Sequence, residues 1–347
     1  MQDKIALFGK TLSEVQEIVK ELNLPKFTAN QIVDWLYKKD ISSIEQMSNL
    51  SKKARTLLDE KYSYGIVDYT QVQESKDGTK KYLFPTKTGH FIETAMIPDI
   101  NPENNRHTVC VSTQKGCKMN CLFCATGKQG WQGDLTTGEI LNQFKNIPEY
   151  VDMTNIVYMG MGEPLDNVEA VLNSLEILSS DYGFAWSPKR ITVSSIGVIP
   201  GMRRFLLESN AHLAISLHSP FEEERKQIMP VQKAYPLLEV LEEIRSFDFG
   251  KQRRISFEYI VFNEFNDSMK HAEKLAEILK GINCRINLIR FHEIPDVDLE
   301  TTNEKRLIEF QQYLMQKGLT TTIRASRGED IFAACGLLST KEHLKEK

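Results

Sequence analysis

The chain of 347 residues is 41% hydrophobic and 26% charged, which is typical of a globular protein with one large and one smaller domain. No apolar run reaches the roughly 18 residues of a membrane helix, and the N-terminus lacks the apolar core of a signal peptide. We therefore expect a cytoplasmic protein without membrane contact. The net charge of −4 excludes a general attraction to nucleic acid, so RNA must be bound by local basic clusters.

Residues 1–65 are predicted to form a small helical domain. Apolar residues recur at helical spacing over 12–24, 29–39 and 51–62, and Pro25 ends the first of these segments. Lys52, Lys53 and Arg55 give this domain a basic edge, so a role in docking RNA is our hypothesis for it.

Residues 66–100 are predicted to form a β-hairpin extension. Two alternating segments flank the turn Lys76-Asp77-Gly78, and a third strand is expected over 90–97. The polar stretch that begins near residue 100 marks the expected domain junction.

Residues 101–340 alternate between strand-like and helix-like segments, which predicts an α/β domain with a parallel sheet. The expected strands are 107–113, 154–160, 190–195, 212–217, 255–262, 285–290 and 320–324. Such a sheet is either a barrel or doubly wound. Polar residues at the strand ends favour a barrel, whose active site lies at the C-terminal mouth of the strands. Residues 341–347 are expected to be a charged tail.

Cysteine spacing is the strongest signal in the sequence. Cys117, Cys121 and Cys124 follow the first expected strand of the sheet at spacings of three and two intervening residues. Three thiolates can hold three irons of a cubane cluster and leave the fourth iron open. The alternative is a structural zinc site, which needs a fourth ligand, and no second cysteine pair follows. An open catalytic cluster is therefore the preferred interpretation.

The segment CVSTQKGCKMNCLFCATGKQG, together with MGMGEPLDN, ITVSSIGVIPGM, LAISLHSP and RASRGEDIFAACG, resembles the RlmN family of radical S-adenosylmethionine (SAM) enzymes, which methylate carbon 2 of adenosine in RNA. The resemblance covers about residues 90–339. It implies a partial (βα)6-type barrel, a [4Fe–4S] cluster on the three cysteines, and SAM as second cofactor. In such enzymes an electron from the cluster cleaves SAM and yields a 5′-deoxyadenosyl radical.

The resemblance also implies three catalytic residues. Cys335 matches the family's methyl carrier, and Cys110 matches the second cysteine, which releases the product and ends in a disulfide with Cys335. Glu93 matches the proton acceptor. Without the family, Cys335 and Cys110 are more simply buried apolar residues, and Glu93 an exposed strand residue. Cys284 matches no family motif and is expected to be structural.

Other matches suggest a SAM pocket. The residues expected to bind SAM are Gly162, Glu163, Ser194, Ser216, Leu217, His218 and His292. His292 stands where the family usually has Asn, so the shape of that contact differs. Arg327 is expected to orient a phosphate or the SAM carboxylate.

The partners implied are 23S rRNA, tRNA and an electron donor such as flavodoxin with its reductase. Two alternatives stay open at this point. One is the sister Cfr-type family, which methylates carbon 8 and tends to have Ala where this chain has Pro164. The other is a non-catalytic RNA-binding protein with a structural metal cluster.

Overall fold

The computed structural model describes residues 4–99, 101–104, 106–250 and 253–340. The expected tail over 341–347 and the junction residue 100 lie outside the described residues. Within the described part of the chain, no helix combines the length and the apolar character needed to cross a bilayer.

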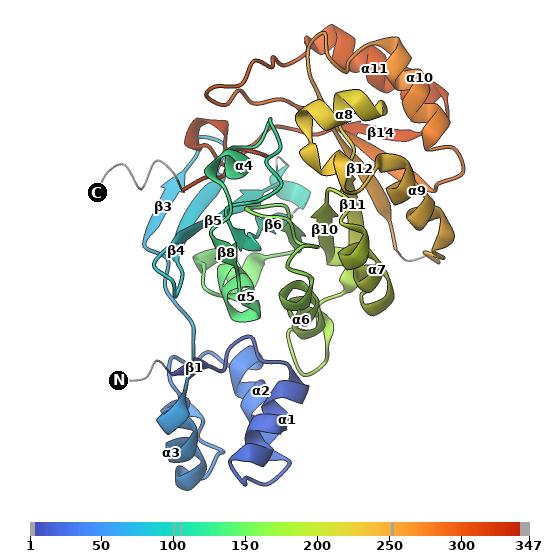
Figure 1. Cartoon of the computed structure of the whole chain (residues 1–347). Coiled ribbons are helices and arrows are strands. Elements are labelled where there is room, and N and C mark those ends of the chain that lie inside the picture. The colour runs from blue at the N-terminus through green and yellow to red at the C-terminus, as the bar shows by residue number, and fades with distance from the viewer. Residues whose placement is uncertain (1–3, 100, 105, 251–252, 341–347) are drawn as a thin grey trace.

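Three helices form the small N-terminal domain, which sits below the large sheet (Figure 1). They are α1 (Leu12–Glu21), α2 (Thr28–Lys38) and α3 (Lys52–Lys61). The short parallel strands β1 (Ile5–Ala6) and β2 (Tyr62–Ser63) close the domain. The three predicted helices are confirmed, but α1 ends before the predicted limit, because Asn23 adopts a left-handed backbone (φ 52°) that stops the helix.

The hairpin extension belongs to the large sheet. Its antiparallel strands are β3 (Gln71–Glu74), β4 (Lys80–Pro85) and β5 (Phe91–Pro98). Strand β5 then pairs antiparallel with β6 (His107–Cys110), with Ala95 opposite Cys110. The predicted strands are confirmed, and the extension lengthens one side of the sheet.

The described strands of this sheet have the order β14-β13-β12-β11-β10-β9-β6-β5-β4-β3. The part from β6 to β14 is parallel. Its further strands are β9 (Asn155–Tyr158), β10 (Ile191–Ser195), β11 (His212–Ser216), β12 (Ile255–Val261), β13 (Cys284–Arg290) and β14 (Thr320–Ile323). The two edge strands, β14 and β3, are not paired with each other, so the barrel is partial, as expected.

Helices between the strands cover the outer face of the parallel part (Figure 1). They are α5 (Thr137–Lys145), α6 (Val168–Ser179), α7 (Ile199–Glu208), α9 (Leu237–Ser246), α10 (Met269–Ile278) and α11 (Glu304–Gln316). Apolar faces of these helices pack on strands whose side chains are themselves buried, β12 throughout its length. This two-sided burial explains the nearly continuous apolar runs of the strands. The short helix α8 (Glu222–Ile228) lies instead at the C-terminal ends of β10 and β11, where the Leu122 amide donates to the Ile228 carbonyl at 2.9 Å.

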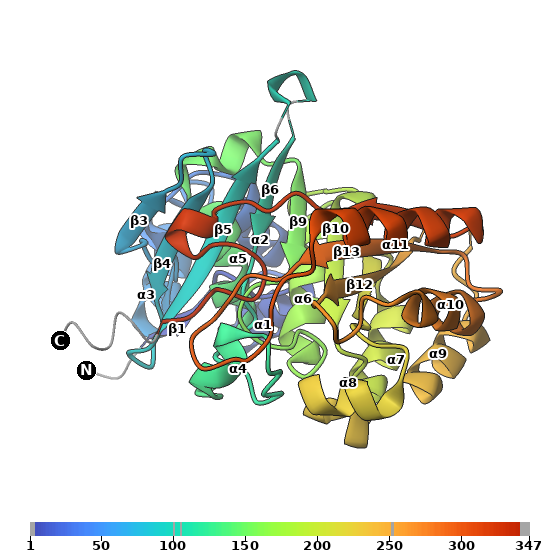
Figure 2. The same cartoon turned by 90° about the horizontal axis from the view of Figure 1, so that it is seen from above.

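Shorter elements complete the chain. They are α4 (Ala125–Gln129), the antiparallel pair β7 (Gln114–Lys115) and β8 (Gly133–Asp134), and the 3-10 helices η1 (Ile44–Gln46), η2 (Pro102–Asn104), η3 (Pro148–Asp152), η4 (Pro188–Arg190), η5 (Pro230–Lys233) and η6 (Glu329–Ile331). The C-terminal segment, residues 324–340, crosses over strands β5 and β6 and approaches α4 (Figure 2). It thereby closes over the inner side of the sheet.

Candidate active site

A cavity of about 150 Å³ lies at the C-terminal ends of the parallel strands. It is enclosed by the cysteine loop, by the ends of β9 to β13 and by the C-terminal segment. Its walls include these residues singled out from the sequence: Cys117, Cys121, Cys124, Gly162, Glu163, Ser194, Ser216, His218 and Cys335. The sequence therefore predicts the place of the site, at the mouth of the partial barrel.

The cysteine loop runs from β7 to α4 and brings its three thiols to one wall. Gly116 makes the entry turn with φ +76°, and a Cβ there would lie 1.7 Å from the carbonyl oxygen of Gly130. Burial raises the pKa of Cys117 to about 12 and also raises the pKa values of Cys121 and Cys124. Buried neutral thiols become thiolates when a metal supplies the positive charge.

This geometry fits an iron–sulfur cluster. The three thiols face one cavity, and they raise one another's pKa through mutual repulsion, so they lie close together. The described residues include no group of three His, Cys, Asp or Glu side chains around a single metal-ion position. In a cubane cluster each thiolate binds a different iron atom, so the three thiols need not surround a single metal position.

Glu163 links two strand ends below the cavity. Its Oε1 accepts a hydrogen bond from the amide of Leu165 at 3.0 Å, and its Oε2 accepts one from the amide of Ile196 at 3.0 Å. Burial raises the pKa of Glu163 to about 7. The preceding Gly162 has φ +98°, and a Cβ there would meet the Gln114 side chain at 2.5 Å. Glycine is therefore needed for the close packing of this turn.

His218 is held rigidly at the end of β11. Its Nδ1 accepts a hydrogen bond from the amide of Ile260 at 3.0 Å, which leaves Nε2 as the protonated nitrogen. Burial, then the charge of Arg225, lowers the pKa of His218 to about 3, so the ring is neutral. Its backbone has φ +56°, a strained value of the kind found at functional sites.

Leu217 differs from its neighbours Ser216 and His218. Its side chain is fully buried and does not line the cavity. Its amide instead donates to the carbonyl oxygen of Glu258 at 3.0 Å, which continues the strand pairing. Any contact of Leu217 with a ligand is thus limited to its backbone.

Cys335 is exposed and is carried by the C-terminal segment against α4. The amide of Ala125 donates to the carbonyl oxygen of Gly336 at 2.7 Å, and the Thr126 hydroxyl donates to that of Leu338 at 2.6 Å. The position of Cys335 is therefore tied to the helix that directly follows Cys124.

Cys110 lies just behind the cavity wall. It is buried against Ala95 and Ala333, so the C-terminal segment packs directly over it. Burial, then the nearby Cys335 thiol, raises the pKa of Cys110 to about 12, whereas the charge of Arg324 lowers it. All six cysteines are free, so the expected Cys110–Cys335 disulfide is not a cross-link of this structure.

Glu93 lies on β5, two residues before Ala95, and does not line the cavity. Its side chain is buried, not exposed, and forms an ion pair with Lys81 at 3.0 Å. Its Oε2 also accepts a hydrogen bond from the amide of Ser339 at 2.9 Å. Glu93 and Cys110 thus both lie beneath the C-terminal segment.

Two predicted residues lie away from the cavity. The Nδ1 of His292 is 3.3 Å from Glu329 Oε1, and neither residue lines the cavity. Arg327 donates to Asp77 Oδ2 at 3.0 Å and to the Asp77 carbonyl at 2.6 Å, so it anchors the hairpin turn. The expectation that Arg327 faces a ligand is therefore wrong in this structure, because the turn of the hairpin occupies its guanidinium group.

An ion pair of the site between a buried carboxylate and a half-buried arginine was not predicted. Arg324 donates to Glu258 Oε2 at 3.3 Å, and both residues line the cavity. Glu258 Oε1 accepts hydrogen bonds from Asn287 at 2.7 Å and from Ser256 at 3.1 Å. A single carboxylate within the apolar strand 255–262 is the signal that could have identified this network.

A second unpredicted residue is Arg225, whose side chain is completely buried. It donates to the carbonyl oxygens of Ile196 at 2.9 Å, Ser216 at 3.2 Å and Leu217 at 3.2 Å. Arg225 thus fixes the ends of β10 and β11 beside the cavity. Burial lowers the pKa of Arg225 to about 10, so it stays charged at neutral pH.

Two family models match the chain. Residues 111–276 match the radical SAM superfamily, and residues 5–63 match the N-terminal domain of ribosomal RNA large subunit methyltransferases. The first match contains the cysteine loop and most of the parallel strands. The second covers the small helical domain.

Relatives match nearly the whole chain. A protein of Parabacteroides distasonis named probable dual-specificity RNA methyltransferase RlmN is 54% identical over 344 residues, covering 99% of both chains. The dual-specificity RNA methyltransferase RlmN of Syntrophus aciditrophicus is 40% identical over 349 residues, also covering 99% of both. A solved structure, a radical SAM methyltransferase from Sphaerobacter thermophilus, superposes with a TM-score of 0.88 at 36% identity, covering 97% of this chain and 100% of that one.

Proposed function

The chain belongs to the RlmN family of radical SAM RNA methyltransferases, and from this premise we propose that it methylates carbon 2 of adenosine in 23S rRNA and tRNA. The observation that carries the proposal is that Cys335 lines the same cavity as Cys117, Cys121 and Cys124. A thiol that carries a methyl group must lie beside the place where SAM is bound.

Radical SAM enzymes use a [4Fe–4S] cluster and SAM. In this chain Cys117, Cys121 and Cys124 would hold the cluster, and Gly162, Glu163, Ser194, Ser216 and His218 would surround SAM. When bound, these groups supply a radical that abstracts a hydrogen atom, which is needed because carbon 2 of adenine is electrophilic and cannot attack a methyl sulfonium.

In the proposed reaction, the Cys335 sulfur would first take the methyl group of one SAM, with S-adenosylhomocysteine as the leaving group, and the 5′-deoxyadenosyl radical from a second SAM would take a hydrogen atom from that methyl group. The methylene carbon would then bond to carbon 2 of adenine, and the radical adduct would give up one electron, for which the oxidised cluster would be the acceptor. Glu93 then accepts the proton that leaves carbon 2. The position of Glu93 beneath the segment that carries Cys335 supports this role, since its Oε2 is bonded to the amide of Ser339.

Product release requires the second thiol. The Cys110 thiolate attacks the Cys335 sulfur, a sulfur–sulfur bond forms, and the bond from sulfur to the methylene carbon breaks. The electron pair of that bond leaves with the methylene carbon, which takes up a proton and becomes the methyl group. Cellular thiols would then reduce the disulfide. The contact of Cys110 with Ala333, two residues from Cys335, supports this step.

The finer points of the proposal concern partners and location. We propose flavodoxin with its reductase as the electron donor and the cytoplasm as the location, where rRNA and tRNA are found. Pro164 lines the cavity and favours carbon 2 over carbon 8, the product of the Cfr-type sister family.

Mass spectrometry of nucleosides tests the proposal. The reconstituted enzyme, supplied with SAM and a reductant, is incubated with unmodified 23S rRNA fragments and tRNA transcripts, with Cys335→Ala as the control. We expect 2-methyladenosine from the native enzyme and none from the variant. Formation of 8-methyladenosine alone would assign the protein to the sister family, and a protein that never cleaves SAM would be the non-catalytic alternative.

A further inference from the structure

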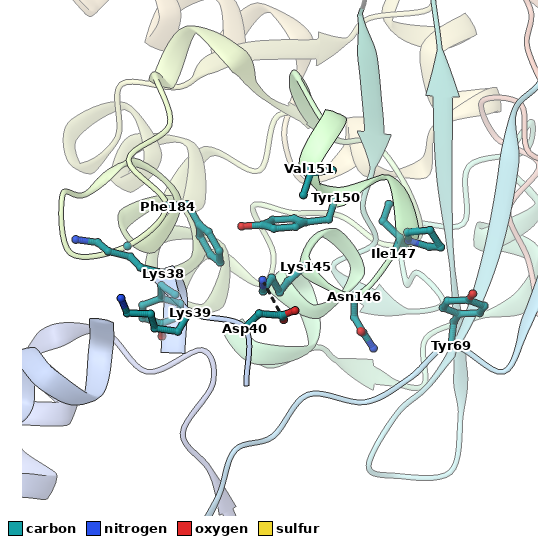
Figure 3. Close-up of a pocket in the computed structure, with 13 residues that line it drawn as sticks. Lys38, Lys39, Asp40, Tyr69, Lys145, Asn146, Ile147, Tyr150, Val151 and Phe184 are labelled. Atoms are coloured by element: carbon teal, nitrogen blue, oxygen red, sulfur yellow. Dashed lines mark ion pairs between the residues drawn. The ribbon is translucent and has the colours of Figure 1, made fainter. Parts of the chain in front are cut away.

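A second hollow, of about 740 Å³, lies at the seam between the helical domain and the partial barrel. It is formed by the end of α2, the end of α5, the 3-10 helix η3 and the chain around Tyr69. Figure 3 shows Asp40 and Lys145 facing each other in it, with Tyr150 and Phe184 beside them. None of these residues has a role in the reaction proposed above.

Lys145 is the unusual residue of this hollow. Only 9% of its side chain is exposed, yet its ammonium group forms no hydrogen bond within the described residues. Its ion pair there is with Asp40, at 3.8 Å, and the Asp40 side chain is completely exposed to solvent. Such a pair is weak, because water screens the carboxylate. The ammonium also lies 4.2 Å from the centre of the Tyr150 ring.

The ion pair with Asp40 does not fully offset the free-energy cost of desolvating the Lys145 ammonium. Burial is the main influence on its pKa and lowers it, which outweighs the opposite effect of Asp40. The ammonium is partly desolvated, which costs free energy that the weak pair with Asp40 offsets only in part. An anion that entered the hollow would remove this cost by pairing with Lys145.

The remaining walls suit a nucleotide. Lys38 and Lys39 lie on the rim, so the lining contains three lysines and one carboxylate, Asp40, although Lys39 also pairs at 3.9 Å with Asp34, which lies outside the lining. The hollow is therefore locally positive although the chain carries a net charge of −4. Tyr69, Tyr150 and Phe184 add aromatic rings, and the combination of cations and rings is what single-stranded nucleic acid requires.

We propose that this hollow binds a phosphate group of the RNA substrate, through Lys145, Lys38 and Lys39, with the adjoining sugar or base against Tyr150 and Phe184. The inference rests on the proposed function, which makes RNA the substrate. It assigns to the seam a second RNA contact that is separate from the catalytic cavity.

The two places lie at opposite ends of one strand. η3 leads into the start of β9, whereas Met159 to Glu163, which line the catalytic cavity, follow its end. A strand of four residues spans roughly 13 Å. The two places are therefore farther apart than this strand is long, and a structured RNA must extend past it for one segment to contact the seam while another presents its adenosine to Cys335.

Equilibrium binding to a tRNA transcript and to a 23S rRNA fragment tests the inference. Fluorescence anisotropy at several KCl concentrations gives Kd and its salt dependence for the full-length protein. The variants are Lys145→Met, which keeps an apolar stem of similar length, and Lys145→Arg, which restores the charge. Lys305→Met is the matched control, since Lys305 is 87% exposed on α11, away from the seam.

We expect Lys145→Met to weaken RNA binding about five- to tenfold and to reduce the slope of log K against log salt by about 0.7. Lys145→Arg and Lys305→Met should bind like the native protein. In methylation assays the KM for RNA should rise while kcat at saturating RNA stays unchanged. If Lys145→Met does not fold, the exposed pair Lys38→Gln/Lys39→Gln provides the same comparison.

An unchanged Kd and salt slope in both Lys145→Met and the double variant would overturn the inference, whatever their affinity for inorganic phosphate. The proposed function fails by a different result. A native protein that binds RNA but forms no methyladenosine contradicts the reaction, and the Kd comparison still decides the role of the seam. A native protein that binds neither RNA contradicts both.

Discussion

The carbonyl oxygen of Gly336 accepts a hydrogen bond from the amide of Ala125 at 2.7 Å, which joins the residue after Cys335 to the residue after Cys124. Cys335, the proposed methyl carrier, and the cysteine loop are thus fixed relative to each other by backbone contact. The next turn of α4 continues the contact, because Gln129 exchanges hydrogen bonds with Thr340 at 2.6 and 3.0 Å.

Gln129→Leu should loosen the C-terminal segment. The substitution removes the hydrogen bonds to Thr340, which is buried and loses these partners. The loss should lower the local stability by about 1–3 kcal/mol. We expect methyl transfer to RNA to fall about tenfold while iron content stays normal. Iron analysis and single-turnover methylation measure the two effects, with Gln16→Leu as the control, since Gln16 is exposed on α1 in the N-terminal domain. Unimpaired methylation would show that Gln129 does not position Cys335.

Replacement of Cys117, Cys121 or Cys124 by Ala should abolish both the cluster and SAM cleavage. Two remaining thiolates cannot hold the three irons that the loop is expected to bind. Cys284→Ala is the matched control, because Cys284 is a half-buried thiol at the start of β13 that does not line the cavity. Absorbance near 400 nm and iron analysis after anaerobic purification report the cluster. A single variant that keeps full iron content would exclude the triad as its ligands.

Cys335→Ala and Cys110→Ala should have opposite effects on a protein–RNA adduct. The first variant lacks the methyl carrier and should form no adduct. The second keeps the carrier but lacks the thiolate that releases the product, so the adduct should accumulate. Denaturing gel electrophoresis detects the crosslink, which should disappear in the double variant. Normal multiple turnover by Cys110→Ala, without a crosslink, would make Cys110 a packing residue of β6.

His212 should make the stability depend on pH. Its Nδ1 accepts a hydrogen bond from the amide of Arg254 at 3.0 Å, and burial, then the charges of Arg254 and Arg253, lowers the pKa of His212 to about 4. In the unfolded chain His212 takes up a proton near pH 6.5. The contribution of neutral His212 to stability is therefore complete above pH 6.5 and is lost as the pH falls toward 4.

Between pH 7 and pH 5 this residue should account for a loss of about 2 kcal/mol in the free energy of unfolding. His212→Asn keeps an acceptor in place of Nδ1 but cannot titrate. Urea unfolding at both pH values should therefore show a smaller loss in the variant. Equal losses in the native protein and the variant would mean that His212 binds a proton in the folded state as readily as in the unfolded chain.

Most of the fold can be predicted from local patterns. Strands such as 255–262 are short apolar runs between helical segments, and that alternation is enough to predict a parallel sheet. The pairing of β5 with β6 cannot be predicted in this way. A polar connection separates these strands, and nothing within it sets the register of Ala95 against Cys110.

The residues of the site likewise fall into those that local patterns predict and those that they do not. Residues that directly follow a strand, such as Glu163 and His218, can be assigned to the cavity because parallel strands end at one edge. Cys110, Glu93 and Arg324 depend on the path of the C-terminal segment, which no periodicity describes. The same holds for Arg327, whose partner Asp77 is 250 positions away in the sequence.

Contacts between residues so far apart in the sequence affect the order in which the molecule folds. The bonds that hold the C-terminal segment join residues 255 positions apart, Ser75 to Asp330, and 246 apart, Glu93 to Ser339. Closing loops of this length costs more entropy than forming neighbouring strands, so these contacts form late. We therefore expect the segment to exchange its amide hydrogens by opening locally while β9 to β13 stay protected. Cys110, which is buried beneath this segment, would then become accessible to thiols or oxidants without unfolding of the sheet.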